Sequence, residues 1–284
     1  MVMNRLTRKK RERILDRVRL GATLEDAKAK IVVMIPALNE EKTIADVISR
    51  IAKVFGENSY RYEIVVIDDG STDKTSRIAR EAGGDVVEHF WNRGLAEVMK
   101  TGLGEALRRN ADVVVNIDAD GQYRPEEIPR LIGPILDGKA DMVLGSRFTG
   151  NIEYMPLIKW LGNRFFTWLL VMVTGFPFTD TQTGFRALTH DAARRIVIHS
   201  RYTYTQEMLI HATEAGLRII EVPIRFGKRK HGNSRLIFNP LSYGLRVLPI
   251  IFHAFRDYHP SMLRARVFGF LADILTMLQR ENKN

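Results

Sequence analysis

Asp118 and Asp120 stand one residue apart at the end of "VVVNIDADGQ" (113–122), a run that begins with apolar residues. Because an unpaired buried charge is costly, both side chains should lie where a strand leaves a sheet. Two carboxylates with this spacing on a turn can bind one hard divalent cation, which also contacts phosphate oxygens. The same acids could instead cap a helix or face solvent, and only their position after a buried strand favours a metal site.

Two other kinds of site with this spacing fit the sequence poorly. An EF-hand loop beginning at Asp118 would need glycine at its sixth position and an oxygen ligand at its twelfth, but Gly121 is fourth and Pro129 is twelfth. A phosphatase of the haloacid-dehalogenase type, with Asp118 as nucleophile, normally has threonine after the D-x-D-G run and uses its first strand. Here Gln122 follows, and the strand comes later in the chain.

A second acidic pair, Asp68 and Asp69, ends the apolar part of "VVIDDGSTDKT" (65–75). Gly70 permits a turn, and Asp73 is placed to cap the helix expected after it. Since one cap is enough for one helix, a carboxylate of the pair is left to accept hydrogen bonds from the ribose or base of a nucleotide. The alternative is that both acids only cap.

The elements that must position these acids alternate between strands and helices. Between the first two strands, Ile44, Val47, Ile48, Ile51 and Phe55 mark one face of a helix. This order predicts an α/β fold with a mostly parallel, Rossmann-like sheet and helices on both faces. Ligands of such folds bind at the carboxyl ends of the strands, where "PALNE", "DDGSTD", "DADGQ" and "GSR" all fall. Apolar, β-branched runs predict the strands themselves at 30–36, 62–68, 85–90, 111–118, 141–146 and 217–226.

Basic charge is confined to the two ends of the chain. Residues 1–20 carry eight basic and two acidic residues, and residues 225–284 carry eleven and three, although the whole chain has a net charge of only +10. The body is therefore slightly acidic, and a nucleic acid or an anionic membrane surface could bind the ends. Nucleic acid is disfavoured because residues 1–20 contain no aromatic side chain for base stacking.

The flanking segments are expected to be helical. Residues 1–29 form a basic N-terminal extension, and 237–284 hold two amphipathic stripes that pack on the core, on a second subunit or on a membrane surface. These stripes comprise Leu241, Leu245, Leu248, Phe252 and Phe255, then Leu263, Val267, Phe270 and Ile274. No apolar run reaches the roughly 20 residues of a membrane span, and no secretory signal is visible. We therefore expect a cytoplasmic protein, peripheral on the cytoplasmic face of a membrane, with a homo-oligomer left open. The absence of cysteine excludes disulfides and thiol nucleophiles.

Six ordered motifs between about Lys30 and Leu236 carry a family resemblance. They are "VVMIPALNEEKTI", "EIVVIDDGSTDKT", "NIDADGQYRPEEIPRL", "DMVLGSRF", "DTQTGFRAL" and "KRKHGNSRL". In this order they resemble the inverting glycosyltransferases of family 2, specifically the dolichyl-phosphate mannose synthase group. The resemblance implies a GT-A fold over residues 30–236, a nucleotide-diphosphate sugar as donor and Mg²⁺ or Mn²⁺ as cofactor.

Position by position, the resemblance also implies site residues. Asp118 and Asp120 would be catalytic and, with Gln122, would hold the metal on the diphosphate. Neither the sugar nor the base follows from these motifs, so GDP-mannose and UDP-hexoses are both compatible. The donor nucleotide would be bound by Pro36, Glu40, Asp68, Asp69 and Gly70.

The acceptor is expected to be a polyprenyl or dolichyl phosphate. A phosphate monoester has a second pKa of about 6, so it is mostly ionised at neutral pH and needs cations rather than a general base. Glu207 is either an acid favoured by the dipole at a helix N-terminus or a catalytic residue, since it lies near the position where relatives that act on hydroxyl groups have a base. The catalytic interpretation leaves a transferase acting on a sugar hydroxyl or a lipid-linked sugar as the alternative. The residues expected to hold the acceptor phosphate are Ser146, Arg147, Arg164, Arg229 and Ser234.

Processive polysaccharide synthases of the same family are disfavoured. They carry a Q-x-x-R-W motif beside the acceptor channel, and none of the three tryptophans, Trp91, Trp160 and Trp168, follows an arginine. A transferase that adds one sugar is therefore the expected activity.

Overall fold

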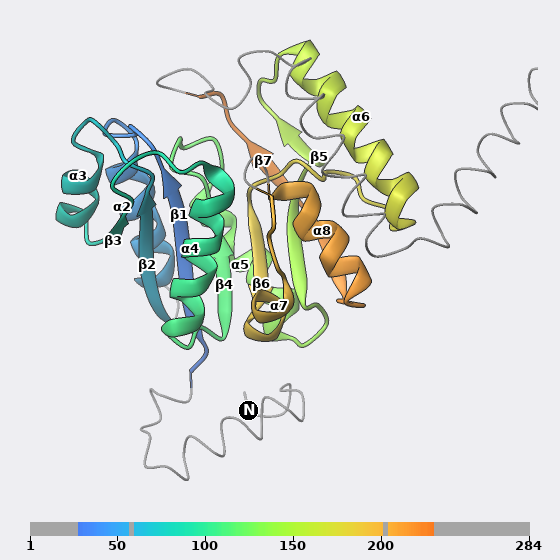
Figure 1. Cartoon of the computed structure of the whole chain (residues 1–284), viewed down its shortest axis with the longest axis horizontal. Coiled ribbons are helices and arrows are strands. Elements are labelled where there is room, and N and C mark those ends of the chain that lie inside the picture. The colour runs from blue at the N-terminus through green and yellow to red at the C-terminus, as the bar shows by residue number, and fades with distance from the viewer. Residues whose placement is uncertain (1–27, 57–59, 201–203, 230–284) are drawn as a thin grey trace, which may run out of the picture.

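The computed structural model describes residues 28–56, 60–200 and 204–229 (Figure 1). The predicted N-terminal extension as far as residue 27, Ser234 and the amphipathic segment 237–284 lie outside the described residues. Within the described residues, no helix combines the length and the apolar content that crossing a membrane requires.

A seven-stranded sheet with the order β3-β2-β1-β4-β6-β5-β7 forms the centre of the described part. All six predicted strands are confirmed, with most ends shifted by one or two residues and β5 running six residues beyond its predicted end. No apolar run indicated β6, which runs antiparallel to both of its neighbours, β4 and β5. The strands are β1 (Lys30–Ala37), β2 (Arg61–Asp68), β3 (Asp85–Glu88), β4 (Val113–Asn116), β5 (Met142–Ile152), β6 (Arg186–Thr189) and β7 (Ile219–Phe226).

Helices cover both faces of this sheet (Figure 1). Alternate residues of β1 point to opposite faces, so Ile31 and Val33 join one apolar core while Val32 and Met34 join the other. One face is covered by α2 (Ile44–Gly56), α3 (Thr75–Glu81) and α5 (Ile128–Leu136), which follows the 3₁₀ turn Pro125–Glu127. The other face is covered by α4 (Leu95–Arg108), α6 (Leu157–Thr174), α7 (His190–Arg195) and α8 (Thr205–Glu214). The predicted α/β fold is confirmed.

Candidate active site

A cavity of about 410 Å³ opens at the carboxyl edge of the sheet. It forms there because the parallel strands β1, β2 and β4 end side by side and the chain turns away from each of them. Five expected site residues are not among those that line it: Asp68, Gly70, Ser146, Arg164 and Glu207. The expected residues that do line it are Pro36, Glu40, Asp69, Asp118, Asp120, Gln122, Arg147 and Arg229.

Asp118 and Asp120 share the cavity with Gln122. The turn after β4 places them there, with Gly121 at a φ of 72°, and one Asp120 oxygen (Oδ1) accepts a hydrogen bond of 3.0 Å from the Gln122 backbone amide. Gln122 donates its own side-chain amide to the carbonyl of Gly227 at 3.0 Å, which leaves its amide oxygen for another contact. Three oxygen-bearing side chains are thus gathered within five residues of the chain.

The environment of Asp118 fits a divalent cation. Burial, followed by the nearby charge of Asp120, raises the pKa of Asp118 to about 7. Among the described residues, none donates a hydrogen bond to this carboxylate. A β-carbon at residue 184 would come within 2.9 Å of both Asp118 oxygens, so Gly184 gives the carboxylate its space. Close carboxylates with such a pKa are stabilised in their charged form by a hard cation such as Mg²⁺ or Mn²⁺.

Asp68, the last residue of β2, and Asp69, which follows it, make different contacts. Asp69 lines the cavity, and its two oxygens accept hydrogen bonds of 2.9 Å from the backbone amides of Arg93 and Gly94, so it orders the loop before α4. His89 contacts the same carboxylate at 2.8 Å. Asp68 instead accepts hydrogen bonds from the Ser71 amide, at 2.8 Å, and from the Ser76 hydroxyl. Of the two acids expected at the donor, Asp69 alone therefore lines the cavity.

Gly70 acts through the backbone rather than at the cavity surface. Its φ is 74°, and a β-carbon there would lie 2.6 Å from the carbonyl carbon of Trp91. Only glycine tolerates both the left-handed conformation and this close approach. The residue therefore lets the loop that carries Asn92 and Gly94 lie against the end of β2, and these two residues line the cavity.

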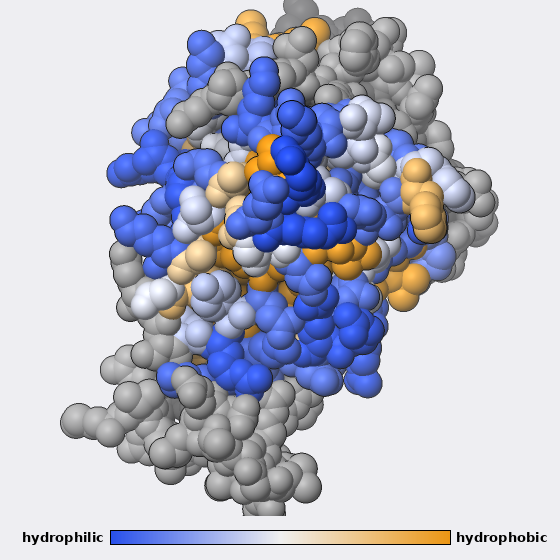
Figure 2. Space-filling model, turned by 90° about the vertical axis from the view of Figure 1, so that its left-hand side faces the viewer, coloured by the Kyte–Doolittle hydropathy of each residue, from blue (hydrophilic) through white to orange (hydrophobic). Residues whose placement is uncertain are grey.

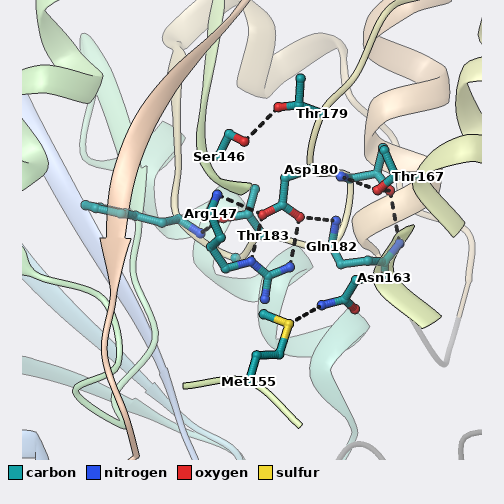
Figure 3. A network of polar contacts seen from close by, with 12 residues as sticks. Ser146, Arg147, Met155, Asn163, Thr167, Thr179, Asp180, Gln182 and Thr183 are labelled. Carbon is teal, nitrogen blue, oxygen red and sulfur yellow. Dashed lines mark hydrogen bonds and ion pairs between the residues drawn. The ribbon is translucent and has the colours of Figure 1, made fainter. Parts of the chain in front are cut away.

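Arg147 is held in a buried ion pair beside the cavity (Figure 3). Its Nε and Nη2 donate to the two oxygens of Asp180 at 2.7 and 2.8 Å, and its backbone amide donates to Oδ2 at 3.0 Å. This partner and the neighbouring charges raise the already high pKa of Arg147, against the opposing effect of burial. Ser146 turns away from the cavity, and its hydroxyl lies 2.7 Å from that of Thr179.

Lys159 is a cavity cation that no sequence motif indicated. It lies on α6 together with Asn163, which also lines the cavity. Burial and the charge of Arg147 lower its pKa, and among the described residues its ammonium has no hydrogen-bond or ion-pair partner. Arg164, the residue expected here, is exposed, with its guanidinium carbon 5.5 Å from the centre of the Phe148 ring.

Arg229 lies in the chain that follows β7 and reaches the turn of residues 118–122. Its Nη2 lies 2.5 Å from a carboxylate oxygen of Glu40 and 3.6 Å from one of Asp120. The backbone amide of Gly227 donates to the carbonyl of Gln122 at 2.8 Å, which fixes the path of this segment. Residues distant in the sequence thereby meet above Asp120.

Glu207 is not among the residues that line the cavity, which favours a structural acid over a base. Its two oxygens accept hydrogen bonds from the backbone amides of His199, at 2.7 Å, and Ser200, at 2.9 Å. The side chain is buried in the first turn of α8, where an acid favours the helix dipole. Tyr204 and Thr205, beside the start of α8, line the cavity instead.

Comparisons with known proteins agree with this geometry. Residues 32–198 match the family model for glycosyl transferase family 2. The chain belongs to glycosyl transferase family 2. The chain is 33% identical to a UDP-N-acetylglucosamine–dolichyl-phosphate N-acetylglucosaminyltransferase of Methanococcus voltae, over 69% of this chain and 84% of that protein. An undecaprenyl-phosphate mannosyltransferase of Micrococcus luteus is 31% identical, over 73% and 87% of the two chains.

A solved structure also resembles this chain in its fold. A crystal structure of glucosyl-3-phosphoglycerate synthase from Mycobacterium tuberculosis, in complex with Mn²⁺, UDP and phosphoglyceric acid, superposes with a TM-score of 0.65. It is 25% identical and covers 81% of this chain and 80% of its own. The expected GT-A fold and glycosyltransferase activity are confirmed, and the enzyme has relatives whose names specify polyprenyl or dolichyl phosphates.

Proposed function

We propose that this glycosyltransferase moves one sugar from a nucleotide-diphosphate sugar to the phosphate of a polyprenyl or dolichyl phosphate. Asp118, Asp120 and Gln122 would hold Mg²⁺ or Mn²⁺ at the diphosphate. The bound cation would neutralise the charge that develops on the departing diphosphate. Pro36 and Asp69 would lie on the nucleoside side of the cavity, and Arg147 and Lys159 on the acceptor side.

The observation that supports a phosphate acceptor is the chemistry of the residues that line the cavity. Arg147 and Lys159 are among them, and no histidine of the described residues is. The acids of the cavity are Glu40, Asp69, Asp118 and Asp120. Glu40 pairs with Arg229, Asp69 holds backbone amides, and the other two form the expected metal pair. A hydroxyl acceptor would lack a base here, whereas an ionised phosphate needs only cations.

The proposed reaction needs no proton transfer. An oxygen of the acceptor phosphate forms a bond to the anomeric carbon of the sugar as the bond from that carbon to the donor diphosphate breaks. The nucleoside diphosphate leaves with that electron pair, and attack from the opposite side inverts the anomeric centre. Lys159 and Arg147 would hold the attacking phosphate in line, which is the main contribution that positioned charges can make to such a step.

The alternative of a hydroxyl acceptor has lost its candidate base. Glu207, the residue expected in that role, is committed to the backbone amides of residues 199 and 200. No other observation in the described residues favours this alternative.

The test is sugar transfer by the full chain with Mn²⁺ and a panel of labelled donors that includes GDP-mannose, UDP-glucose and UDP-N-acetylglucosamine. Each donor is combined with a polyprenyl phosphate or with the polyprenol of the same length. We expect one donor to give a glycolipid with the phosphate only. Equal transfer to the polyprenol, or transfer to a soluble sugar alone, would contradict the proposal.

Lys159 gives a sharper test of the acceptor side. Replacing it in Lys159→Met should raise the KM for the polyprenyl phosphate about 10- to 100-fold, because a charge-assisted contact is lost. The KM for the nucleotide sugar should stay unchanged. Arg164→Met is the matched control, since it removes a cation of the same helix that lies outside the cavity. Equal effects of the two substitutions in detergent solution would show that Lys159 has no special contact with the acceptor.

A further inference from the structure

Helix α6 has two faces of different character. The inner row, Lys159, Asn163, Phe166 and Leu170, lies on one side of the helix, with Lys159 and Asn163 at the cavity and the other two in the core. The outer face carries a stripe at alternating three- and four-residue spacing. It comprises Ile158 (61% exposed), Leu161 (53%), Phe165 (49%), Trp168 (48%) and Met172 (36%).

The outer face is unusual for this molecule as well as for a surface helix. Seven of the twelve large hydrophobic residues exposed in the described part lie on α6, with Leu157 and Trp160 beside the stripe. The opposite side of the molecule, where α3 and β3 lie, is mostly hydrophilic in its described residues (Figure 2). A surface helix normally turns its apolar stripe towards the core, and a contiguous exposed patch marks an interaction surface.

The charges and aromatic residues of α6 indicate the chemistry of the partner. Residues 157–174 contain no acid, and their two charged residues, Lys159 and Arg164, are basic. Trp160 and Trp168 suit the boundary between lipid headgroups and acyl chains, where an aromatic ring meets both apolar and polar surroundings. An outer apolar face that contains no acid and is flanked by the exposed Arg164 is complementary to an anionic lipid surface.

The apolar face of α6 lies close to the cavity. Because Lys159 is on the inner row of the same helix, the cavity and the apolar face are separated only by the width of α6, about 10 Å. The chain of a polyprenyl phosphate stays in the bilayer, since each buried CH₂ contributes about 0.8 kcal/mol. The enzyme must therefore bring its phosphate site to the lipid rather than extract the lipid.

We propose that the outer face of α6 lies on an anionic membrane surface with its apolar side chains at the acyl-chain boundary. A lipid phosphate then reaches Lys159 while its hydrocarbon chain remains in the bilayer beside α6. The membrane contact stands on the surface of α6 alone, and the path of the acceptor rests on the proposed function.

Tryptophan fluorescence tests the contact directly. In Trp91→Phe, only Trp160 and Trp168 on α6 report, whereas the matched control Trp160→Phe/Trp168→Phe leaves only Trp91, which lies between β3 and α4. Both proteins are mixed with phosphatidylglycerol vesicles that contain a phosphatidylcholine brominated on its acyl chains. We expect the α6 tryptophans to lose intensity by quenching and the control to keep it. Quenching of neither protein, or equal quenching of both, overturns the proposal.

A second variant separates the membrane contact from the reaction. Leu161→Gln/Phe165→Gln changes two outer residues, and circular dichroism checks that it folds. We expect less vesicle binding and less transfer to a polyprenyl phosphate in vesicles, with unchanged transfer to a short, water-soluble prenyl phosphate. If wild type uses neither acceptor, the proposed function fails while the quenching result still decides the membrane contact.

Two other occupants of this face are outcomes of the same experiments. If the α6 tryptophans become quenchable only after residues 237–284 are removed, the chain covers its own helix and the proposal is wrong. If wild type sediments as a dimer and Leu161→Gln/Phe165→Gln as a monomer, a second copy is the occupant, and the proposal is again wrong. A wild type and a variant that bind vesicles equally would also contradict it.

Discussion

Asp118 titrates near neutral pH because burial and the charge of Asp120 raise its pKa to about 7. A metal ion binds the ionised carboxylate, so protons compete with it. We expect Mn²⁺ affinity to fall about tenfold for each pH unit below 7. Titration of the protein with Mn²⁺ at pH 6, 7 and 8, followed by electron paramagnetic resonance, measures this. The same affinity at pH 6 and pH 8 would show that Asp118 is not a ligand.

The stability of the metal-free protein should change with pH in the opposite direction to the Mn²⁺ affinity. In the folded, metal-free protein Asp118 binds a proton more tightly than in the unfolded chain, so this group lowers stability as pH rises from about 4 to about 7. Asp118→Asn should therefore melt at a higher temperature than wild type at pH 8 without metal, and at a similar temperature at pH 4. The same substitution should remove transfer activity, which separates loss of function from loss of fold.

Gly184 offers a steric test of the proposed metal site. In Gly184→Ala the new β-carbon would meet both Asp118 oxygens, so the carboxylate must move. We expect transfer to fall on the order of 100-fold, comparable to the loss of one positioned electrostatic group. The matched control is Gly104→Ala in α4, where a β-carbon meets nothing within 4 Å. Activity of Gly184→Ala close to that of the control would contradict the assignment of Asp118.

The sequence could not decide between Asp68 and Asp69. The two acids are neighbours at the end of β2, and neighbouring residues of a strand point in opposite directions. Asp69 faces the loop before α4, and Asp68 faces the turn into α3. Which one borders the cavity depends on how the strand is seated between its helices. By contrast, the Asp118 and Asp120 pair, with one residue between them, could be placed together from their spacing.

At the scale of elements, Glu207 in the first turn of α8 can be tested as a structural or a catalytic acid. Glu207→Gln would leave one of the two backbone amides at residues 199 and 200 without its acceptor, at a cost of about 1–3 kcal/mol in the free energy of unfolding. We expect the folded variant to keep its kcat, because the carboxylate does not line the cavity. Urea unfolding and steady-state kinetics measure the two quantities. A fall in kcat of about 100-fold or more, with unchanged stability, would instead identify a general base.

Strands and helices with a regular apolar period could be predicted, and short or two-sided elements could not. The five apolar positions from Ile44 to Phe55 are enough to identify α2 by their spacing. β6 escapes because its four residues carry no alternation, with Arg186 fully buried at its start. The place of Lys159 at the cavity could not be predicted, because it depends on which face of α6 turns towards the cavity. That rotation is fixed by the tertiary packing of Phe166 and Leu170.

At the scale of the whole molecule, the distribution of basic residues favours binding to an anionic membrane. The basic residues concentrate at 1–20 and 225–284, and each one near an anionic leaflet can add about 1 kcal/mol of attraction. We expect flotation with anionic liposomes to recover the protein at low salt and less of it at 0.5 M salt, where this attraction is screened within about 4 Å. Neutral liposomes are the control. Recovery that ignores both salt and lipid charge would leave the basic ends without a role in binding.

Two hydrogen bonds between Gln122 and Gly227 join the turn of residues 118–122 to the segment that carries Arg229. The carbonyl of Gln122 accepts from the Gly227 amide, and its side chain donates back to the Gly227 carbonyl. In the proposed reaction Gln122 would hold the metal at the donor, so this contact is a route by which a bound donor would alter the position of Arg229. By linkage, any factor by which the nucleotide sugar alters acceptor affinity must equal the factor by which the acceptor alters nucleotide affinity.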